Sequence, residues 1–267
     1  FTAYDFSIYG GFAGVETVRA QRNYTNNVTI LTGDVGVPGN ASDNAYHVVT
    51  AVNVNANTVV DGVTIRNGNA NGGNSATQSG GGMYIAYGDL TVANVIFANN
   101  SAAFYGGGLF SRYGAPTLRN VQFTGNQAVY GGGMYNRSLA ITMTDMVFIN
   151  NSASTGGGMN NKEGRPVITN ARFEGNTATS QGGGLYNNDG APQLINVRFE
   201  NNRAGSTGGG LYSDTGAPSL TAVQFISNSS TASNGGGVYL SKDTLTLSGS
   251  VFMSNTAKSH GGAIYAY

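Results

Sequence analysis

The sequence predicts an all-β protein folded as a parallel β-helix, a coil of short strands in which each turn, or rung, stacks on the one before it. Triplets of Gly recur every 25–27 residues and begin at positions 80, 106, 131, 156, 182, 208 and 235, with a degenerate Gly261-Gly262-Ala263 at the end. A Phe lies 17 residues after the start of each full triplet, and an Asn follows three residues after that Phe. Apolar residues alternate with polar or small ones between these motifs, which is typical of strands.

The period and the composition exclude other repeat folds. Helical repeats need roughly 33–47 residues with helix formers at 3.6-residue spacing, whereas Gly, Asn, Thr and Ser dominate here. Leucine-rich repeats have a similar period, but they require a Leu-x-x-Leu-x-Leu frame that this chain lacks. A unit of 25–27 residues fits about three short strands per rung, with rungs about 4.8 Å apart.

Each rung begins, directly after its Gly triplet, with a strand whose side chains alternate in direction. The first residue is aliphatic, as at Met83 and Leu109, and is expected to point into the core. The second is aromatic in every rung except at Asn160, and by alternation it points outward. We call these outward residues the aromatic strip: Tyr84, Phe110, Tyr135, Tyr186, Tyr212 and Tyr239.

The rest of the rung is a polar loop and a second strand. Three loops end in Gly-Ala-Pro, and Pro is tolerated at a strand start, where its missing N–H is not needed. The second strand carries an inward apolar residue such as Leu118, then bends at a stacked Asn or Asp and continues into the Phe segment that closes the rung.

Two columns are expected to run the length of the coil. The core column consists of Phe97, Phe123, Phe148, Phe173, Phe199, Phe225 and Phe252. The corner column consists of Asn100, Asn126, Asn151, Asn176, Asn202, Asn228 and Asn255. Asn tolerates a left-handed backbone, and stacked Asn side chains can hydrogen-bond along the axis. The Gly triplets suit a corner where neighbouring backbones approach closely.

The repeat predicts one domain over residues 1–267. Residues 80–267 hold the regular rungs, and residues 1–79 are expected to form divergent N-terminal rungs with surface loops. Ile65 aligns with the core column, and an insertion rich in Asn and Gly covers residues 69–79. Roughly ten rungs would give a coil about 45–50 Å long.

The composition excludes several classes of protein. The chain has 42 Gly among 267 residues, 10% charged residues, a net charge of zero and no Cys. Such weak, balanced charge offers no basic surface for nucleic acid or an anionic membrane. The lack of Cys excludes disulfides and thiolate chemistry. Because no 18 consecutive residues are apolar, no membrane-spanning segment is predicted.

The paired motifs Gly-Gly-Gly-Leu/Met-Tyr and Phe-x-x-Asn resemble the repeats of polymorphic outer-membrane-protein passenger domains. They are also similar to those of anchored bacterial surface proteins with right-handed parallel β-helix repeats. Residues 8–16 (Ile-Tyr-Gly-Gly-Phe-Ala-Gly-Val-Glu) and 61–65 (Asp-Gly-Val-Thr-Ile) resemble the latter group. The resemblance covers nearly the whole chain. It implies a right-handed coil, secretion, and an extracellular or cell-surface location.

The acidic residues give little indication of catalysis. Lyases and hydrolases of this shape need clustered carboxylates, but here the acids are scattered at about one per rung. The most regular set lies in the loops after the triplets: Glu163, Asp189, Asp214 and Asp243. We expect solvated loop charge there, with a weak Ca²⁺ or glycan contact line as the alternative.

The remaining charged residues do not change this interpretation. Two Arg-Glu pairs in adjacent rungs, Arg172 with Glu174 and Arg198 with Glu200, are expected to be surface ion pairs of small energetic value. Neither His47 nor His260 has a recognisable catalytic partner. We therefore predict a protein that is not an enzyme, with no catalytic residue, no metal site and no cofactor.

The aromatic strip has two interpretations. The rings stack on one another and stiffen the coil, or they present a flat surface that binds sugar rings or another protein.

The ends of the coil are expected to be sites of assembly. No amphipathic helix covers either end, and complementary open strands give a head-to-tail contact that propagates into a filament. One possible joint is the insertion of residues 1–9 as a strand into the unfinished last rung of a neighbour. The candidate assembly residues are Phe1, Tyr4, Phe6, Ile8, Tyr9, Ile264, Tyr265 and Tyr267.

The sequence thus predicts a non-enzymatic extracellular structural protein, a β-helical cell-surface or filament subunit that polymerises head to tail. Its expected partners are other copies of itself or other surface components, with no nucleic acid. The alternative is a surface adhesin or glycan-binding passenger domain that uses the aromatic strip. A polysaccharide lyase or hydrolase is less favoured.

Overall fold

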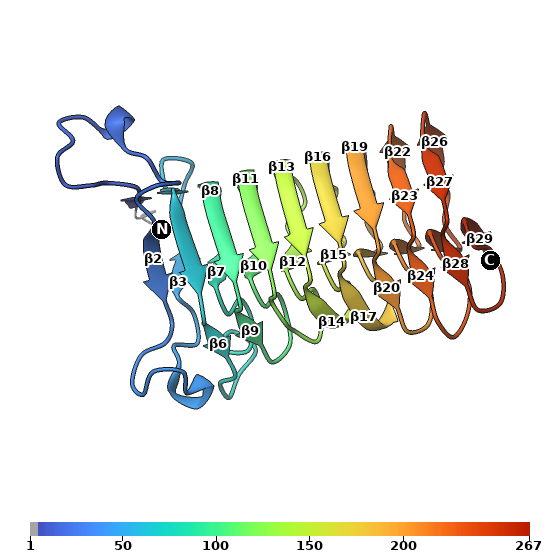
Figure 1. The fold of residues 1–267 in the computed structure, drawn as a ribbon, viewed down its shortest axis with the longest axis horizontal. Helices are drawn as coiled ribbons and strands as arrows, with labels where there is room; N and C mark the ends of the chain where they lie inside the picture. Colours follow the sequence, from blue (N-terminus) through green and yellow to red (C-terminus); the bar gives the residue numbers. More distant parts are fainter. Residues whose placement is uncertain (1–4) are drawn as a thin grey trace.

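The computed structural model describes residues 5–267 and confirms an all-β parallel β-helix (Figure 1). The first and last strands lie at opposite ends of the long axis, and every strand pairing among these residues is parallel. Seven regular turns begin at the Gly triplets, and one less regular turn precedes them. The coil thus has fewer turns than the roughly ten predicted, because residues 10–28 and 33–48 form excursions that contain no strand.

Three faces of the coil are parallel sheets. The largest sheet contains β1 (Ser7–Tyr9), β2 (Thr29–Thr32), β4 (Val59–Asp61), β5 (Val63–Arg66), β8 (Thr91–Ala98), β11 (Thr117–Thr124), β13 (Thr142–Ile149), β16 (Val167–Glu174), β19 (Gln193–Glu200), β22 (Ser219–Thr221), β23 (Gln224–Ile226), β26 (Thr246–Ser248) and β27 (Val251–Met253). We call it the Phe sheet because it carries the core column.

The second sheet follows the Gly triplets and carries the aromatic strip, so we call it the Tyr sheet. It contains β3 (Val49–Val52), β7 (Met83–Ala86), β10 (Leu109–Arg112), β12 (Met134–Arg137), β15 (Met159–Lys162), β18 (Leu185–Asn188), β21 (Leu211–Asp214), β25 (Val238–Ser241) and β29 (Ile264–Ala266).

The third face is narrower. It contains β14 (Ser152–Thr155), β17 (Thr177–Gln181), β20 (Arg203–Ala204), β24 (Ser229–Ser230) and β28 (Thr256–Ala257), with a separate pair, β6 (Asn69–Ala70) and β9 (Ser101–Ala102). Two short 3₁₀ helices, η1 (Arg19–Gln21) and η2 (Ala41–Asp43), lie in the N-terminal excursions. Figure 1 shows these excursions projecting from the N-terminal end of the coil.

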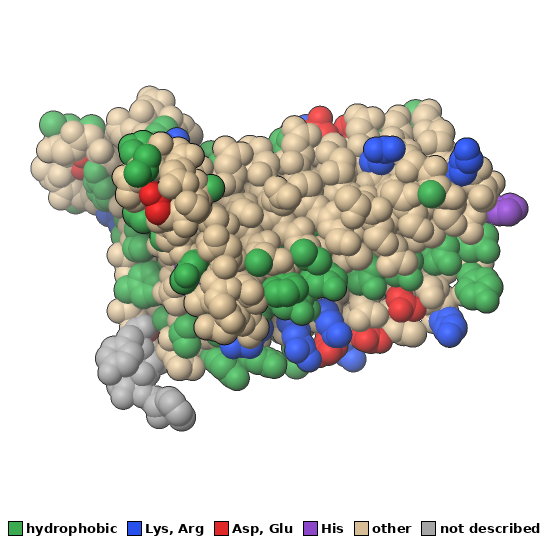
Figure 2. All heavy atoms as spheres, turned by 90° about the horizontal axis from the view of Figure 1, so that it is seen from below, with side chains coloured by type: hydrophobic (Ala, Val, Ile, Leu, Met, Phe, Trp, Pro, Cys, Tyr) green, Lys and Arg blue, Asp and Glu red, His purple; other side chains and the backbone are tan. Residues whose placement is uncertain are grey.

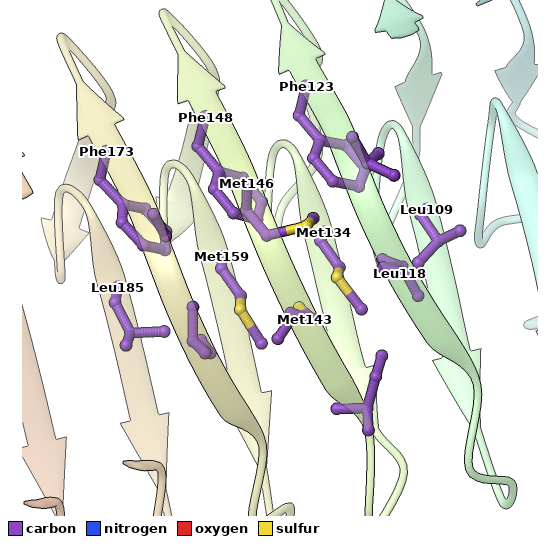
Figure 3. Packing of buried hydrophobic residues seen from close by; sticks show 14 of the residues in the cluster. Leu109, Leu118, Phe123, Met134, Met143, Met146, Phe148, Met159, Phe173 and Leu185 are labelled. Atoms are coloured by element: carbon purple, nitrogen blue, oxygen red, sulfur yellow. The ribbon is translucent and has the colours of Figure 1, made fainter. Parts of the chain in front are cut away.

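The core is a continuous set of stacked columns. The rings of the Phe column from Phe97 to Phe252 lie 4.5–4.9 Å apart, centroid to centroid, and are nearly parallel. Figure 3 shows Phe123, Phe148 and Phe173 directed into the interior, where Met134 and Met159 of the Tyr sheet are also buried. In-register pairing explains the columns, because each residue meets its equivalent one rung away.

The Gly triplets form a corner that leaves no room for a side chain. The first Gly of each triplet has a positive φ, from 61° to 71°, a conformation that side-chain-bearing residues rarely adopt. A Cβ on the third Gly, as at Gly133, would lie 2.6 Å from the carbonyl oxygen of Gly158 in the next rung. The triplets therefore permit the backbones of successive rungs to approach at this corner.

The corner column forms a chain of amide hydrogen bonds. Each Asn Nδ2 donates to the Oδ1 of the Asn in the next rung at 2.9–3.0 Å, from Asn100 to Asn255. The Nδ2 also donates to the backbone carbonyl of a Phe-column residue, as from Asn126 to Phe97 at 2.9 Å. Burial of these amides is tolerable because their polar atoms are paired.

Candidate assembly and binding surfaces

The aromatic strip points away from the main core, yet most of its rings are buried. Tyr84, Phe110 and Tyr135 form a second hydrophobic cluster, each with 5–6% of its surface exposed. Tyr105, from the connection between the third face and the Tyr sheet, packs against this cluster. Figure 2 shows hydrophobic side chains in a band along this face, next to a row of charged side chains. A fully exposed flat strip is therefore absent over these rungs.

The strip consists of two stacks with an interruption between them. Rings in the first stack, from Tyr84 to Tyr135, lie 5.1–5.6 Å apart, and rings in the second, from Tyr186 to Tyr265, lie 5.0–5.2 Å apart. Asn160 separates the stacks and is in register with Tyr135 on one side and Tyr186 on the other. The stacking favours the stiffening interpretation wherever the rings are continuous.

A hollow of about 260 Å³ lies at the interruption. It is lined by Tyr105, Tyr130, Tyr135, Thr155, Asn160, Lys162, Tyr186 and Asn188. The aromatic exception at Asn160 was visible in the sequence. The contribution of Tyr105, Tyr130 and Thr155 was not, because these residues precede the triplets on a different face of the coil.

The phenols beside the hollow are held in their neutral form. Burial raises the pKa of Tyr135 far above its usual value, and nearby Tyr105 adds to this effect. Burial also raises the pKa of Tyr186 to about 12. Both hydroxyl groups are therefore protonated at physiological pH and can donate hydrogen bonds.

The C-terminal end of the coil exposes residues that are buried in every regular turn. Leu247 is 41% exposed, whereas Leu220, its partner one rung earlier, is fully buried. Ile264 and Phe252 are likewise only partly buried, although their partners Val238 and Phe225 are fully buried. The core columns thus reach the last described rung, where their side chains are partly exposed.

The N-terminal end of the described residues also exposes apolar side chains. An apolar hollow of about 550 Å³ is lined by Phe6, Ile8, Ile30, Leu31, Thr32, Val48, Val49 and Thr50. Its residues continue the interior, since Phe6, Ile8, Leu31 and Val48 pack against the main core while remaining partly exposed.

The candidate assembly residues are distributed over both ends. Phe1 and Tyr4 lie outside the described residues. Ile8 and Tyr9 belong to β1, which pairs with β4 of the same chain along one edge and has no paired neighbour along the other among the described residues. Tyr265 stacks on Tyr239, and Tyr267 is 78% exposed.

The four loop acids do not form one column. Glu163 and Asp189 occupy equivalent positive-φ positions, but the next equivalent residue is Thr215. Asp214 pairs instead with Asn188 of the previous rung, one position earlier. This offset corrects the expected alignment, because Asp214 lies one position nearer to its Gly triplet than Glu163 and Asp189 do. Within residues 5–267 no three His, Cys, Asp or Glu side chains gather as a metal site would require.

The other charged residues have local partners. Arg172 pairs with Glu174 at 2.5 Å and Arg198 with Glu200 at 2.8 Å, each pair within a single exposed strand face. The ring of His47 contacts the carbonyl oxygen of Gly80 at 3.0 Å through Nδ1, and burial lowers the pKa of this His.

Comparison with known proteins agrees with this architecture. Residues 170–188, 196–214 and 249–267 match the model of the Chlamydia polymorphic membrane protein (Chlamydia_PMP) repeat. Each matched segment runs from just before a Phe of the core column through the next Gly corner. The search of curated proteins and the search of solved structures found no match.

The fold and the matched repeats define a β-helical repeat protein, and they confirm the resemblance to polymorphic membrane protein repeats. This repeat type supports a location at the outer membrane or cell surface. In the part of the chain that the structure describes, no helix is long and apolar enough to cross a membrane.

Proposed function

We propose that this protein is a structural component of a cell surface, a stiff β-helical rod that joins other copies of itself head to tail. The observation that carries the proposal is the exposure of core columns on the C-terminal face, where Leu247 is 41% exposed and its buried partner Leu220 is not exposed at all. An apolar surface of this kind favours contact with another surface.

The two ends are complementary in backbone direction. Among the described residues, β26, β27 and β29 have a paired neighbour on one side only, and the same holds for β1, β2 and β3 at the other end. Because all strands are parallel, a second copy placed on the axis would continue both large sheets without reversing any strand. Such a contact joins two different faces and therefore repeats without closing.

The side chains at the two ends also fit this arrangement. The N-terminal hollow is lined by Phe6, Ile8 and Leu31, and the C-terminal face presents Leu247 and Phe252. Burial of these groups in a joint would remove apolar surface from water at both ends, at roughly 25 cal/mol per Å².

Sedimentation velocity and electron microscopy test the proposal. The unmodified chain is expected to form concentration-dependent species that appear as rods in micrographs. Leu247→Lys introduces a charge on the C-terminal face and is expected to give monomers. Thr246→Lys, on the adjacent exposed position of β26, is the matched control and should leave assembly unchanged. A purely monomeric unmodified chain would contradict head-to-tail joining, and rods formed by Leu247→Lys would contradict this joint.

Two alternative functions, glycan binding and polysaccharide cleavage, are less well supported by the structure. Glycan binding along the whole strip is disfavoured by the burial of Tyr84, Phe110 and Tyr135, which leaves the interruption at Asn160 as its best location. Polysaccharide cleavage is disfavoured, because no three His, Cys, Asp or Glu side chains gather within residues 5–267 and Asp214 is offset from Asp189. Assays for reducing sugars or unsaturated products on anionic polysaccharides would reveal such an activity.

A further inference from the structure

The interruption of the aromatic strip leaves a slot of defined thickness. Tyr135 and Tyr186 are two rungs apart, with Asn160 in register between them. Two strand spacings are roughly 9.6 Å, whereas one ring-to-ring step within the stacks is 5.0–5.6 Å. The space between the two Tyr rings holds the side chain of Asn160, which is smaller than an aromatic ring, and a hollow of about 260 Å³ lies beside it.

The slot is open to solvent and has a firm floor. Asn160 and Tyr135 are buried, with 3% and 6% of their surfaces exposed. Tyr130, on the rim, is 37% exposed, and Tyr186 and Lys162 are partly exposed. A ligand can thus enter from the surface and rest on side chains whose positions are held by strand pairing.

The rim carries several hydrogen-bonding groups. Asn160 Nδ2 donates to Thr155 Oγ1 at 2.9 Å, while its Oδ1 accepts no hydrogen bond from any residue in the range 5–267. Asn188 lies beside the slot. Lys162 also lines it and takes part in none of the four ion pairs found among the described residues.

We propose that the hollow of this slot binds a single pyranose ring of a glycan, with one face of the sugar on the partly exposed ring of Tyr186. Aromatic side chains bind sugar rings through their flat faces, and the surrounding amide, hydroxyl and ammonium groups meet the hydroxyl groups of the sugar. An aromatic side chain from a protein would fill the same thickness, but it would leave most of these polar groups without a partner.

The ammonium group of Lys162 adds a preference for acidic sugars. A carboxylate on the bound ring would form a charge-assisted contact that a neutral sugar cannot form. We therefore expect oligosaccharides that contain uronic acid to bind more tightly than neutral oligosaccharides of the same length. This site is independent of the end faces, so it does not rest on head-to-tail assembly.

The test fills the slot with the residue type that six other rungs carry at this position. Asn160→Tyr is expected to fold, to unfold at the same temperature or higher, and to lose binding of uronic oligosaccharides by about tenfold or more in calorimetric titration. Lys162→Ala should weaken binding of the acidic oligosaccharide and leave that of the neutral one nearly unchanged. Lys242→Ala, which also removes one positive charge but lies three rungs away, is the matched control.

The proposal is overturned if neither oligosaccharide binds the unmodified chain, or if Asn160→Tyr binds them as well as the unmodified chain does. N-acetyltyrosinamide serves as the competing ligand. If it binds in the slot and the oligosaccharides do not, the site recognises an aromatic side chain of another protein, and the sugar assignment is wrong.

Discussion

The inner Phe column and the outer aromatic strip are built by the same repeat but differ in continuity. The Phe column is unbroken, and its members from Phe97 to Phe225 are fully buried. The strip is interrupted at Asn160, and its rings range from buried to half-buried. A missing ring in the core would leave a cavity, whereas a missing ring on the outer side leaves a slot that solvent or a ligand can fill. The aromatic strip can therefore lose a ring without loss of the fold, whereas the Phe column is kept unbroken.

Loss of one ring from the inner column should have the largest effect. Phe173→Ala is expected to lower the free energy of unfolding by about 3–5 kcal/mol, because the cavity lies between two stacked neighbours and cannot collapse. Urea denaturation followed by circular dichroism measures the change. Phe173→Leu, which keeps most of the volume, is the control and should lose much less. A loss below about 1 kcal/mol for the Ala variant would be incompatible with a core column.

The same truncation in the outer strip should have a smaller effect. Tyr239→Ala removes a ring stacked 5.2 Å from Tyr212 and 5.2 Å from Tyr265, but the ring is only partly buried. The expected loss is about 1–2 kcal/mol, from partial apolar burial and aromatic stacking. Tyr239→Phe retains the stack and should remain close to the unmodified chain in the same denaturation experiment. Equal losses for Tyr239→Ala and Phe173→Ala would remove the distinction between the columns.

Of the two columns, only the aromatic strip should lose stability at high pH, because Tyr has a titratable hydroxyl group and Phe has none. Burial raises the pKa of Tyr186 to about 12 in the folded chain, from 10.0 for an ordinary Tyr. The raised pKa of Tyr186 contributes to the free energy of unfolding, and this contribution is fully present below pH 10. It falls as the pH rises from 10 towards 12, because the Tyr hydroxyl of the unfolded chain loses its proton first. Thermal unfolding across this range should show a smaller decline for Tyr186→Phe than for the unmodified chain. An identical decline in both would show that Tyr186 does not contribute.

The constant spacing of the repeat made it possible to predict which residues stack on one another. It did not predict how the connections between strands fold. Constant spacing between Gly, Phe and Asn places equivalent residues in register, so the core and corner columns could be derived by alignment alone. Tyr105 covers the strip from a connection whose length varies between rungs, and the pattern contains no information on how it folds back. The offset of Asp214 from Asp189 has a different origin: the two acids lie at different distances from their Gly triplets, so in-register pairing places them in different columns.

The N-terminal region shows a second limit of the pattern. Residues 10–28 and 33–48 leave the coil as excursions without a strand, and the repeat spacing does not extend into this region to indicate how many residues they occupy. Contacts such as the pairing of Arg22 with Asp61 hold one of these excursions against the first turn. Arg22 lies in an excursion outside the repeating strands, so repeat spacing could not indicate the contact.

The amide column gives the coil an electrical direction. From Asn100 to Asn228, each Nδ2 donates one amide proton to the Asn Oδ1 of the next rung, so these side-chain dipoles add instead of cancelling, and each bond polarises the next. At the last rung, Asn255 accepts from Asn228 and donates to the carbonyl of Phe225, which leaves its second amide proton available on the end face. The two ends of the coil thus differ in hydrogen-bonding character as well as in shape, and a rod built from it has a plus end and a minus end.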